Sequence, residues 1–486
     1  MSTFYVACDL GADKGRVMLG TLAQGELTLS EAHQFPNRPI RQKDSLLWDM
    51  PSLFEESLEG LRAIGAYDEP VESISCHSWG SDYLLFDARG SLLAPTYHPA
   101  DARFREGMKS VVAKVPREVI YEETGGQPSP GSTLCQLGAE KSRRLSKADC
   151  LMPVADAFNY LLGGVSRVET SLACTTRLFN PVTEAWSERL FKALHLPREI
   201  FPPVVPGGTE LGPLRPELAK RTGLAEARVI ASCSHELSAA LATLPAAYGE
   251  TWGFLRLGPS AIVGAELDRP RISEVIRDSN FTMELGFGGS ARLSTPAVGL
   301  SLVEDCRRFW GQKDREIQLD VLMHLAGSAP PFESLINPED PRFHETSDLP
   351  LKIQAFCKET HQAVPRKPGP VIRCVLESLA LLYRKRLDDF EALTGTQITR
   401  LYLMGSSVNA LLTHFTANAL QIPVVLAPTE AASIGNVIVQ ALTLGHLKSL
   451  AQGRQIVRSS FKMQTIMPHA LAWNAAYGRL RQFCSN

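Results

Sequence analysis

The beginning of the chain lacks a basic segment followed by a long apolar stretch, because residues 1–11 reach the acidic Asp9 without a Lys or Arg. This argues against a secretory signal peptide. No apolar run approaches the roughly 18 residues that a membrane-spanning helix needs. The ten cysteines are scattered without a CxxC pair, so neither a zinc site nor a disulfide framework is indicated. We therefore expect a cytoplasmic protein, with no membrane as partner, whose cysteines are mostly core or surface residues.

An excess of charge of one sign is also lacking. The formal net charge is -2 over 486 residues, and no long acidic or basic run occurs. Nucleic acids and anionic membranes attract proteins through concentrated positive charge. We therefore expect neither nucleic acid nor a membrane surface as the main partner. The sequence is long enough for two domains, because 486 residues suffice for two domains that each bury a substantial core.

Two parts of the chain share the pattern of an apolar strand, a turn with Leu-Gly and a second apolar strand. The first covers residues 4–22 and continues with a strand at 26–35, which predicts an antiparallel meander. The second covers residues 252–267. Strands and helices then alternate between residues 371 and 444, which indicates a parallel or mixed sheet covered by helices. The pattern predicts an α/β protein with a duplicated domain and a boundary between residues 244 and 250.

The first turn has the composition of a phosphate-binding loop. Residues 9–16 read Asp-Leu-Gly-Ala-Asp-Lys-Gly-Arg, and backbone N–H groups exposed in such a turn can bind phosphate oxygens. Asp9, at the end of the strand, can hold a hydrated magnesium ion. A glycine-containing hairpin without a ligand explains the same residues equally well.

Two later strand-to-helix turns are further candidates. Gly405 and Ser406 follow an apolar strand and precede a predicted helix, whose N-terminal amides can bind an anion or a nucleotide. Glu236 lies in a similar turn, where its carboxylate could accept a proton from a substrate hydroxyl. The alternative for this second turn is structural, with Ser234 as the N-cap and Glu236 as a favourable charge in the first helical turn.

Two loops in the first half carry residue types that often bind sugars. Trp79 follows an apolar strand, and Asp101 and Arg103 lie in a later loop. Indole faces are common platforms for sugar rings, and Asp and Arg bond hydroxyl groups in a defined geometry. A core tryptophan and a surface ion pair explain the same residues equally well.

In this order, the segments resemble the FGGY carbohydrate kinases over nearly the whole chain. The resemblance rests on Asp9-Leu-Gly-Ala with Gly15-Arg16, Trp48-Asp49, Trp79-Gly80, Asp101 with Arg103, Met152-Pro153, Ser234-His235, residues 378–383, and Glu430-Ala431 with Gly435-Asn436. It implies two ribonuclease-H-like domains of the actin-like ATPase superfamily around a central cleft, with residues 1–244 binding the sugar and residues 245–486 binding the nucleotide. It also implies ATP and Mg²⁺ as cofactors, a small-molecule sugar as partner, and a monomer or homodimer.

The resemblance further implies a role for each candidate residue. Asp9 would assist magnesium, and Glu236 would act as the catalytic base. The implied nucleotide-binding residues are Ala12, Asp13, Lys14, Gly15, Arg16, Gly258, Pro259, Glu304, Gly405 and Ser406. The implied sugar-binding residues are Trp79, Gly80, Asp101, Arg103, His235 and Leu237.

Several of these positions depart from the family pattern. Family members carry Asp at Glu236, and Thr at Pro259, whose ring offers neither a hydroxyl nor an N–H group. The family's turn of three glycines is here Met404-Gly405-Ser406, where the side chains would narrow the approach of a nucleotide. The departures leave two functions open. One is an ATP-dependent kinase of a ketose such as L-rhamnulose, and the other is a catalytically weakened relative that senses a sugar.

Overall fold

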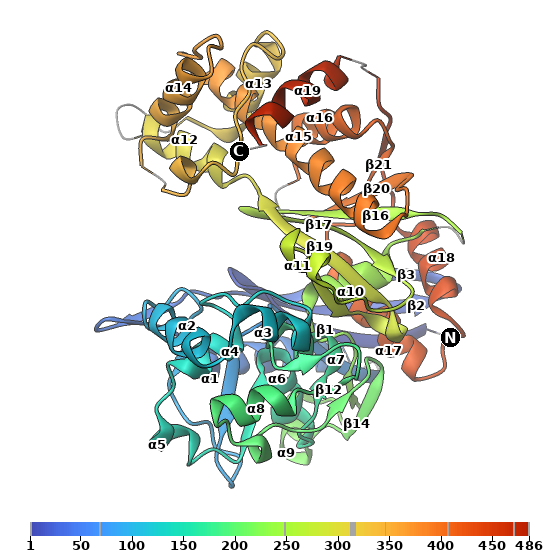
Figure 1. Cartoon of the computed structure of the whole chain (residues 1–486). Coiled ribbons are helices and arrows are strands. Elements are labelled where there is room, and N and C mark those ends of the chain that lie inside the picture. Colours follow the sequence, from blue (N-terminus) through green and yellow to red (C-terminus); the bar gives the residue numbers. More distant parts are fainter. Residues whose placement is uncertain are drawn as a thin grey trace. The chain divides into compact units, whose positions relative to one another are not determined.

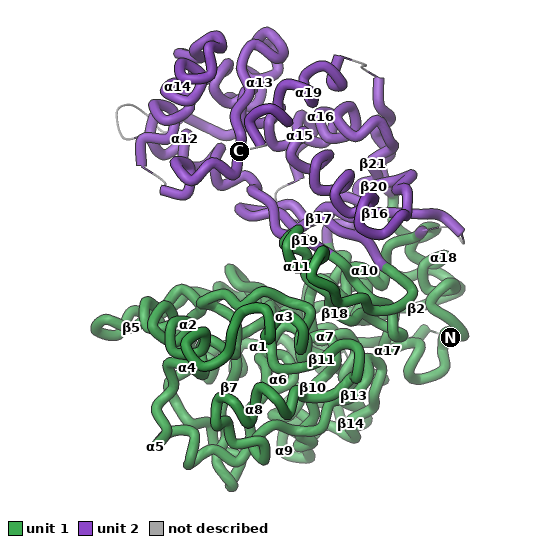
Figure 2. The backbone as a smooth tube through the Cα atoms, in the orientation of Figure 1, with its two compact units in different colours: residues 1–245, 267–293, 430–462 green, residues 246–266, 294–429, 463–486 purple. Residues whose placement is uncertain are grey.

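The computed structural model describes residues 2–67, 70–246, 249–311, 317–345, 347–405, 408–469 and 472–484. The chain is a mixed α/β protein (Figure 1) that divides into two compact units (Figure 2). Unit 1 contains residues 1–245, 267–293 and 430–462, and unit 2 contains residues 246–266, 294–429 and 463–486. Each unit is therefore built from three separate stretches of the chain.

Unit 1 contains a six-stranded sheet with the order β14-β15-β6-β1-β2-β3. Its strands are β1 (Ser2–Leu10), β2 (Lys14–Ala23), β3 (Glu26–Pro36), β6 (Val71–Ser78), β14 (Thr209–Pro213) and β15 (Arg228–Ala231). The predicted meander is confirmed, because β1 pairs antiparallel with β2 and β2 pairs antiparallel with β3. On its other side β1 pairs in parallel with β6, which places the ends of β1 and β6 next to each other.

Unit 1 also contains shorter strands and α-helices. The strands are β4 (Ile40–Gln42), β5 (Ser45–Trp48), β7 (Tyr83–Phe86), β8 (Thr96–Tyr97), β9 (Cys150–Pro153), β10 (Val168–Glu169), β11 (Phe179–Asn180), β12 (Ala185–Trp186), β13 (Val204–Val205) and β18 (Thr282–Leu285). The helices are α1 (Met50–Gly65), α2 (Arg103–Lys114), α3 (Arg117–Thr124), α4 (Thr133–Gly138), α5 (Ser142–Leu145), α6 (Val154–Gly163), α7 (Thr170–Thr175), α8 (Glu188–Leu194), α9 (Pro216–Thr222), α10 (Glu236–Thr243), α11 (Glu274–Asp278), α17 (Ala431–Thr443) and α18 (Leu450–Ser460). Of these helices, α1, α6, α10, α17 and α18 contact the six-stranded sheet.

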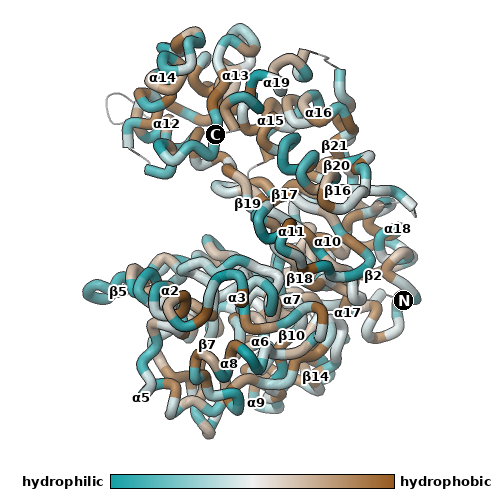
Figure 3. The backbone as a smooth tube through the Cα atoms, in the orientation of Figure 1, coloured by the Kyte–Doolittle hydropathy of each residue, from teal (hydrophilic) through white to brown (hydrophobic). Residues whose placement is uncertain are grey.

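Helix α17, from the last part of the chain, packs on the first strands of unit 1. Tyr5 and Ala7 alternate along β1 toward one face of the sheet, and they share a buried core with Ile434, Val437 and residues of α18. Residues three or four positions apart share one side of a helix, so the repeat in α17 presents a continuous apolar stripe to the strands. The apolar stretches of the core elements appear brown in Figure 3, whereas the exposed residues 41–44 of the β4–β5 hairpin are hydrophilic.

A glycine permits the close packing of α10 against α17. A Cβ atom added at Gly435 would lie 1.8 Å from the carbonyl oxygen of Ala239, which is far inside van der Waals contact. Only glycine therefore allows the two helices to approach this closely. The contact brings the middle of α10 directly against the first half of α17.

Unit 2 repeats the strand pairing with which unit 1 begins. Its strands are β16 (Trp252–Leu257), β17 (Ser260–Leu267), β20 (Arg400–Met404), β21 (Val424–Leu426) and β22 (Thr465–Ile466), and β19 (Ala291–Val298) follows β18 along the chain. β16 pairs antiparallel with β17 and in parallel with β20, as β1 does with β2 and β6. The predicted second strand–turn–strand segment is therefore confirmed, and the shared pairing is what a duplicated domain produces.

The helices of unit 2 are α12 (Ser301–Gly311), α13 (Leu319–Ser328), α14 (Leu349–Glu359), α15 (Pro368–Thr394), α16 (Ala410–Leu420) and α19 (Trp473–Phe483). The longest, α15, begins with Pro368 and ends at Gly395 in the left-handed region, the usual start and stop residues of a helix. Among the residues that the structure describes, no helix combines the length and apolar character needed to cross a membrane.

Candidate active site

Two basic side chains hold the carboxylate of Asp9 near the end of β1. Arg16 on β2 donates to Oδ2 from Nε at 3.1 Å and from a terminal nitrogen at 2.6 Å. Nε2 of His77 on β6 lies 3.2 Å from Oδ1. The strand register explains the cluster, because Asp9 pairs with Arg16 across one ladder and with His77 across the other. Burial by itself would raise the pKa of Asp9, but His77 and Arg16 outweigh it and lower that pKa to about 2. Asp9 is therefore ionised at neutral pH.

Helix α17 orients the buried ring of His77. Nδ2 of Asn436 lies 3.2 Å from Nδ1 of His77. Nε2 of Gln440 donates to Oδ1 of Asn436 at 2.6 Å and to the carbonyl oxygen of Val6 at 3.0 Å. Because Gln440 occupies the oxygen of Asn436, the amide nitrogen of Asn436 faces the ring and donates to Nδ1. The contacts of Asn436 with His77 and Gln440 therefore fix the orientation of the His77 ring beside Asp9.

The turn between β1 and β2, which carries the predicted phosphate-binding residues, is mostly exposed. Ala12, Asp13 and Lys14 are exposed, and Arg16 is partly buried beside Asp9. Asn37, which the sequence did not suggest, fastens the turn, since its Nδ2 donates to the carbonyl oxygen of Gly11 at 2.9 Å and its amide donates to that of Asp13 at 3.0 Å. The turn thus presents backbone to solvent beside an ionised carboxylate.

Gly15 and Lys14 also have structural explanations. A Cβ atom at Gly15 would lie 2.2 Å from the ring of Phe35, so close packing alone requires glycine there. The ammonium group of Lys14 donates to Oε1 of Gln34 at 2.8 Å on the exposed surface. A role of either residue in binding phosphate remains a prediction.

Trp79 forms a buried cluster with Trp48 and Asp82. Oδ2 of Asp82 accepts a hydrogen bond from the indole nitrogen of each tryptophan at 2.8 Å, and Oδ1 accepts one from Gln136 at 2.7 Å. The two tryptophan rings lie 4.7 Å apart between centroids. Trp79 is 9% exposed, so most of its surface is covered by neighbouring side chains. Asp82 was not among the sequence candidates, although it lies three residues after Trp79.

The buried Asp82 predicts a measurable pH dependence of stability. Burial raises the pKa of Asp82 from 3.8 to about 6, so ionisation of this group destabilises the folded protein. Two pKa units correspond to about 3 kcal/mol. This contribution to the free energy of unfolding is complete below about pH 4 and is lost as the pH rises through about 6. We expect Asp82→Asn to lack this component in urea unfolding followed by tryptophan fluorescence. The same pH slope in the parent and the variant would contradict the assignment.

Asp101 and Arg103 do not form the surface ion pair that the sequence left open as a structural explanation. Asp101 is buried, and its carboxylate accepts hydrogen bonds from the amides of Leu46 at 2.7 Å and Arg103 at 3.0 Å. The guanidinium group of Arg103 stacks on the ring of Tyr97 at 3.9 Å and donates to the carbonyl oxygen of Ala139. Asp101 therefore shapes the loop through its backbone contacts. A contact of Arg103 or Asp101 with sugar remains a prediction.

The start of α10 differs in one respect from the purely structural explanation, in which Ser234 caps the helix and Glu236 lies in its first turn. Glu236 is the first residue of the helix and is partly exposed, and the N-cap position belongs to His235. Ser234 donates its hydroxyl to Oδ1 of Asp156 at 2.7 Å instead of capping α10. The prediction of Ser234 as N-cap is therefore wrong, because a buried carboxylate binds its side chain. Leu237 is buried.

Unit 2 brings most of its predicted nucleotide-binding residues near one turn. Gly258 and Pro259 form the turn between β16 and β17, and their carbonyl oxygens accept hydrogen bonds from the amides of Leu300 at 2.9 Å and Ser301 at 3.1 Å. These amides lead into α12, whose first turn contains Glu304. The turn that carries Pro259 therefore fixes the start of the helix that carries Glu304.

Gly405 lies against the same part of β16. Its φ of +123° lies in a region that favours glycine, and an added Cβ would lie 2.1 Å from the carbonyl oxygen of Leu257. Met404 is buried as the last residue of β20. The close approach to Leu257 thus explains why a glycine occupies position 405. Ser406 lies outside the described residues.

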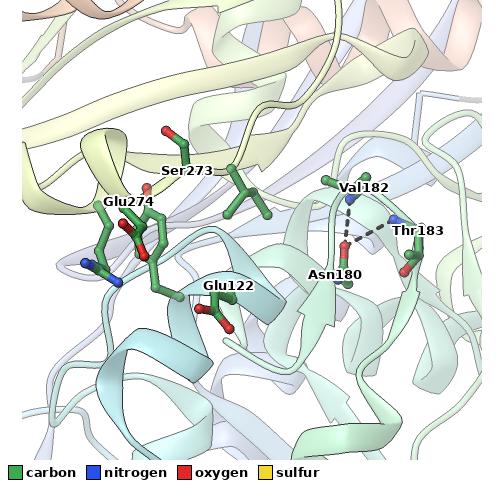
Figure 4. Close-up of a pocket in the computed structure, with 9 residues that line it drawn as sticks. Glu122, Asn180, Val182, Thr183, Ser273 and Glu274 are labelled. Atoms are coloured by element: carbon green, nitrogen blue, oxygen red, sulfur yellow. Dashed lines mark hydrogen bonds between the residues drawn. The ribbon is translucent and has the colours of Figure 1, made fainter.

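A separate pocket of about 330 Å³ lies in unit 1 (Figure 4). It is lined by Tyr121, Glu122, Asn180, Val182, Thr183, Ile272, Ser273, Glu274 and Arg277. Oδ1 of Asn180 accepts hydrogen bonds from the amides of Val182 and Thr183, which shapes one wall. These lining residues differ from all the residues predicted for sugar or nucleotide.

Two family models match the chain, one in each half. The N-terminal domain of the FGGY family of carbohydrate kinases matches residues 4–242, and the C-terminal domain of that family matches residues 253–444. The chain belongs to the FGGY family of carbohydrate kinases. The family resemblance noted in the sequence is confirmed.

Relatives and solved structures of other kinases resemble this FGGY kinase over their whole length. Curated proteins named rhamnulokinase include one from Bacteroides thetaiotaomicron, 36% identical over 98% of both chains, and one from Pectobacterium carotovorum, 34% identical over 99% of this chain and 96% of that protein. A ligand-bound xylulose kinase from Lactobacillus acidophilus has a TM-score of 0.81 at 15% identity, covering 99% of this chain and 97% of that chain. A gluconate kinase from the same organism has a TM-score of 0.83 at 15% identity, covering 100% and 97%. The predicted fold of two ribonuclease-H-like domains is confirmed.

The acidic residues of this FGGY kinase fit a magnesium ion that arrives with a nucleotide. Among the described residues, no group of three or more His, Cys, Asp or Glu side chains is arranged to hold a metal by itself. Mg²⁺ keeps several waters and is commonly bound by one or two carboxylates together with substrate phosphates. The ionised Asp9 beside an exposed turn fits that pattern.

Proposed function

We propose that this FGGY kinase transfers the γ-phosphoryl group of ATP to a hydroxyl group of a ketose, with L-rhamnulose as the substrate. The observation that carries the proposal is the near-complete coverage of relatives named rhamnulokinase at 36% and 34% identity. Phosphoryl transfer depends mainly on positioning and on neutralising charge. The ionised Asp9 and the exposed turn after it support a phosphate-binding role. The alternative of a sugar-binding sensor gains no support from the relatives.

The proposal assigns roles to this chain's own residues. Glu236 accepts the proton of the attacking sugar hydroxyl, because it is a partly exposed carboxylate at a strand-to-helix turn. Asp9 holds the hydrated magnesium ion, and residues 12–16 bind phosphate through backbone amides. Magnesium, when bound, neutralises the charge of the phosphates. Sugar contacts come from Trp79, Gly80, Asp101, Arg103, His235 and Leu237, and nucleotide contacts in unit 2 come from Gly258, Pro259, Glu304, Gly405 and Ser406.

The proposal also covers the division of binding between the two halves of the chain and the oligomeric state. Residues 1–244 are proposed to bind the sugar and residues 245–486 the nucleotide, and the chain is proposed to act as a monomer or homodimer in the cytoplasm. Size-exclusion chromatography with light scattering tests the oligomeric state.

A substrate screen tests the proposed reaction. Purified protein is incubated with ATP and Mg²⁺ and a panel of ketoses, aldoses and polyols, and ADP release is followed. We expect the highest kcat/KM with L-rhamnulose and at least about tenfold less with the matching aldose, L-rhamnose, since a site built for one hydroxyl pattern rejects another. Preference for another sugar would revise the substrate. Absence of turnover with every sugar would contradict the proposed reaction.

A further inference from the structure

Two buried carboxylates lie behind the start of α10, and the proposed chemistry uses neither of them. Asp156 on α6 and Glu169 on β10 are 2% and 1% exposed. Burial raises the pKa of Glu169 to about 7 and the pKa of Asp156 well above its ordinary value. Buried carboxyl groups destabilise a fold unless hydrogen bonds compensate them. The partners of these two groups therefore indicate what they hold in place.

The hydrogen bonds of Glu169 lead to the backbone just before Glu236. Oε2 of Glu169 accepts from the amide of Ser234 at 3.0 Å, from the amide of Ser171 at 3.0 Å, and from the hydroxyl of Ser171. The oxygen of that hydroxyl accepts from the amide of His235 at 3.1 Å. The two consecutive amides that precede Glu236 are thus bound by side chains from β10 and α7.

Asp156 also binds both Ser234 and Glu169. Its Oδ1 accepts the hydroxyl of Ser234 at 2.7 Å, and its Oδ2 accepts the amide of Glu169 at 3.0 Å. The carbonyl oxygen of Ser234 accepts the amide of Ser78 at 2.9 Å. The amide, the hydroxyl and the carbonyl of Ser234 are therefore all fixed by neighbouring elements.

These contacts lie directly before α10, at its N-cap residue and the residue before it. The first amides of a helix need acceptors, which the N-cap side chain usually supplies. Within the described part of the chain, the N-cap residue His235 makes no capping bond with its side chain. Glu169 and Ser171 instead bind the amides of Ser234 and His235, the two residues that precede the first helical residue. The position of the first residue of α10 thus depends on β10 and α7.

We propose that Glu169 and Ser171 are positioning residues for phosphoryl transfer, which hold the backbone of Ser234 and His235 so that His235 and Glu236 face the sugar in a fixed geometry. This inference rests on the proposed function, in which Glu236 accepts the proton and His235 contacts the sugar. A displacement of about 1 Å at a reacting group can lower a rate roughly a hundredfold. Loss of one of several contacts displaces the turn less, and we expect an effect of about tenfold.

Ser171→Ala tests the proposal with a small change. It removes the acceptor of the His235 amide and leaves Glu169 and its bond to Ser234. We expect kcat/KM for the sugar to fall about tenfold and the affinity for ADP to stay unchanged. Hydrogen–deuterium exchange should become faster at the His235 amide. Ser57→Ala is the matched control, because Ser57 is also buried and, among the described residues, its hydroxyl bonds to the carbonyl oxygen of Leu53 within α1 alone.

A pair of variants at Glu169 separates positioning from packing. Glu169→Gln keeps an acceptor oxygen at the same place, whereas Glu169→Met has a similar size and no such acceptor. We expect Glu169→Gln to retain most of the activity and the slow exchange at Ser234, and Glu169→Met to lose both. Equal activity and exchange in the two variants would overturn the proposal.

The outcomes distinguish this inference from the proposed function. If the parent phosphorylates L-rhamnulose and Ser171→Ala behaves like Ser57→Ala, the positioning role is wrong and the reaction stands. If the parent phosphorylates no sugar, the proposed reaction is wrong. Calorimetry with L-rhamnulose and amide exchange then decide the positioning role, and unchanged sugar affinity with unchanged exchange in Ser171→Ala overturns it.

Discussion

Glu236→Gln is expected to lower the rate of sugar phosphorylation by about a hundredfold or more. The substitution keeps the size of the side chain and removes the proton acceptor, and general-base assistance usually contributes at least this factor. Glu236 is partly exposed at the first position of α10, so the melting temperature should change little. Initial rates with saturating ATP and L-rhamnulose, measured beside thermal unfolding, give both quantities.

Glu236→Asp provides the matched comparison. It keeps the carboxylate, shortens the side chain by one methylene, and restores the residue that the family resemblance implies at this position. A rate increase would show that the longer side chain of the parent is a handicap. If Glu236 only favours the helix N-terminus, Glu236→Gln should instead cost roughly 0.3–1 kcal/mol of stability and leave the rate intact. That result would remove Glu236 from the catalytic role.

The strand pattern of both units could be predicted because it is local. Alternation and turn residues predicted the strands at residues 4–22 and 252–267, and the structure contains them as the hairpins β1–β2 and β16–β17. The pairing of each hairpin with a later parallel strand repeats in the two units. The family followed from the order of short motifs along the chain. These features need no knowledge of distant contacts.

The contacts around the site could not be predicted, because they join residues far apart in the chain. His77 meets Asn436 across 359 positions, and no local pattern indicates this pair. The wrong N-cap at Ser234 has the same origin, since Asp156 binds its hydroxyl from another helix. The spacing of four between Asn436 and Gln440 was a usable signal, because two buried amides on one side of an apolar helix need polar partners.

Asp9 is the residue whose replacement should affect both activity and stability. Its pKa is lowered to about 2 by His77 and Arg16 despite burial, so the ionised carboxylate stabilises the folded protein. The stabilisation is fully present above the unfolded value near 3.8 and is lost as the pH falls through about 2. The shift corresponds to about 2 kcal/mol at neutral pH. The carboxylate side chain is 13% exposed, so solvent screens this interaction only weakly.

Asp9→Asn should therefore lower the free energy of unfolding at pH 7 by about 2 kcal/mol, and the difference from the parent should shrink as the pH falls below about 4. Phosphorylation should fall by roughly a hundredfold or more, because removal of one charge-stabilising group commonly has that effect. Asp44→Asn, at an exposed position of the β4–β5 hairpin, is the control and should change neither quantity. Urea unfolding between pH 3 and 7 measures the stability, and initial rates at pH 7 measure the activity.

A stable but inactive Asp9→Asn protein would show that Asp9 serves only to bind magnesium and phosphate. An active but destabilised one would show that the cluster of Asp9 with Arg16 and His77 serves the fold alone.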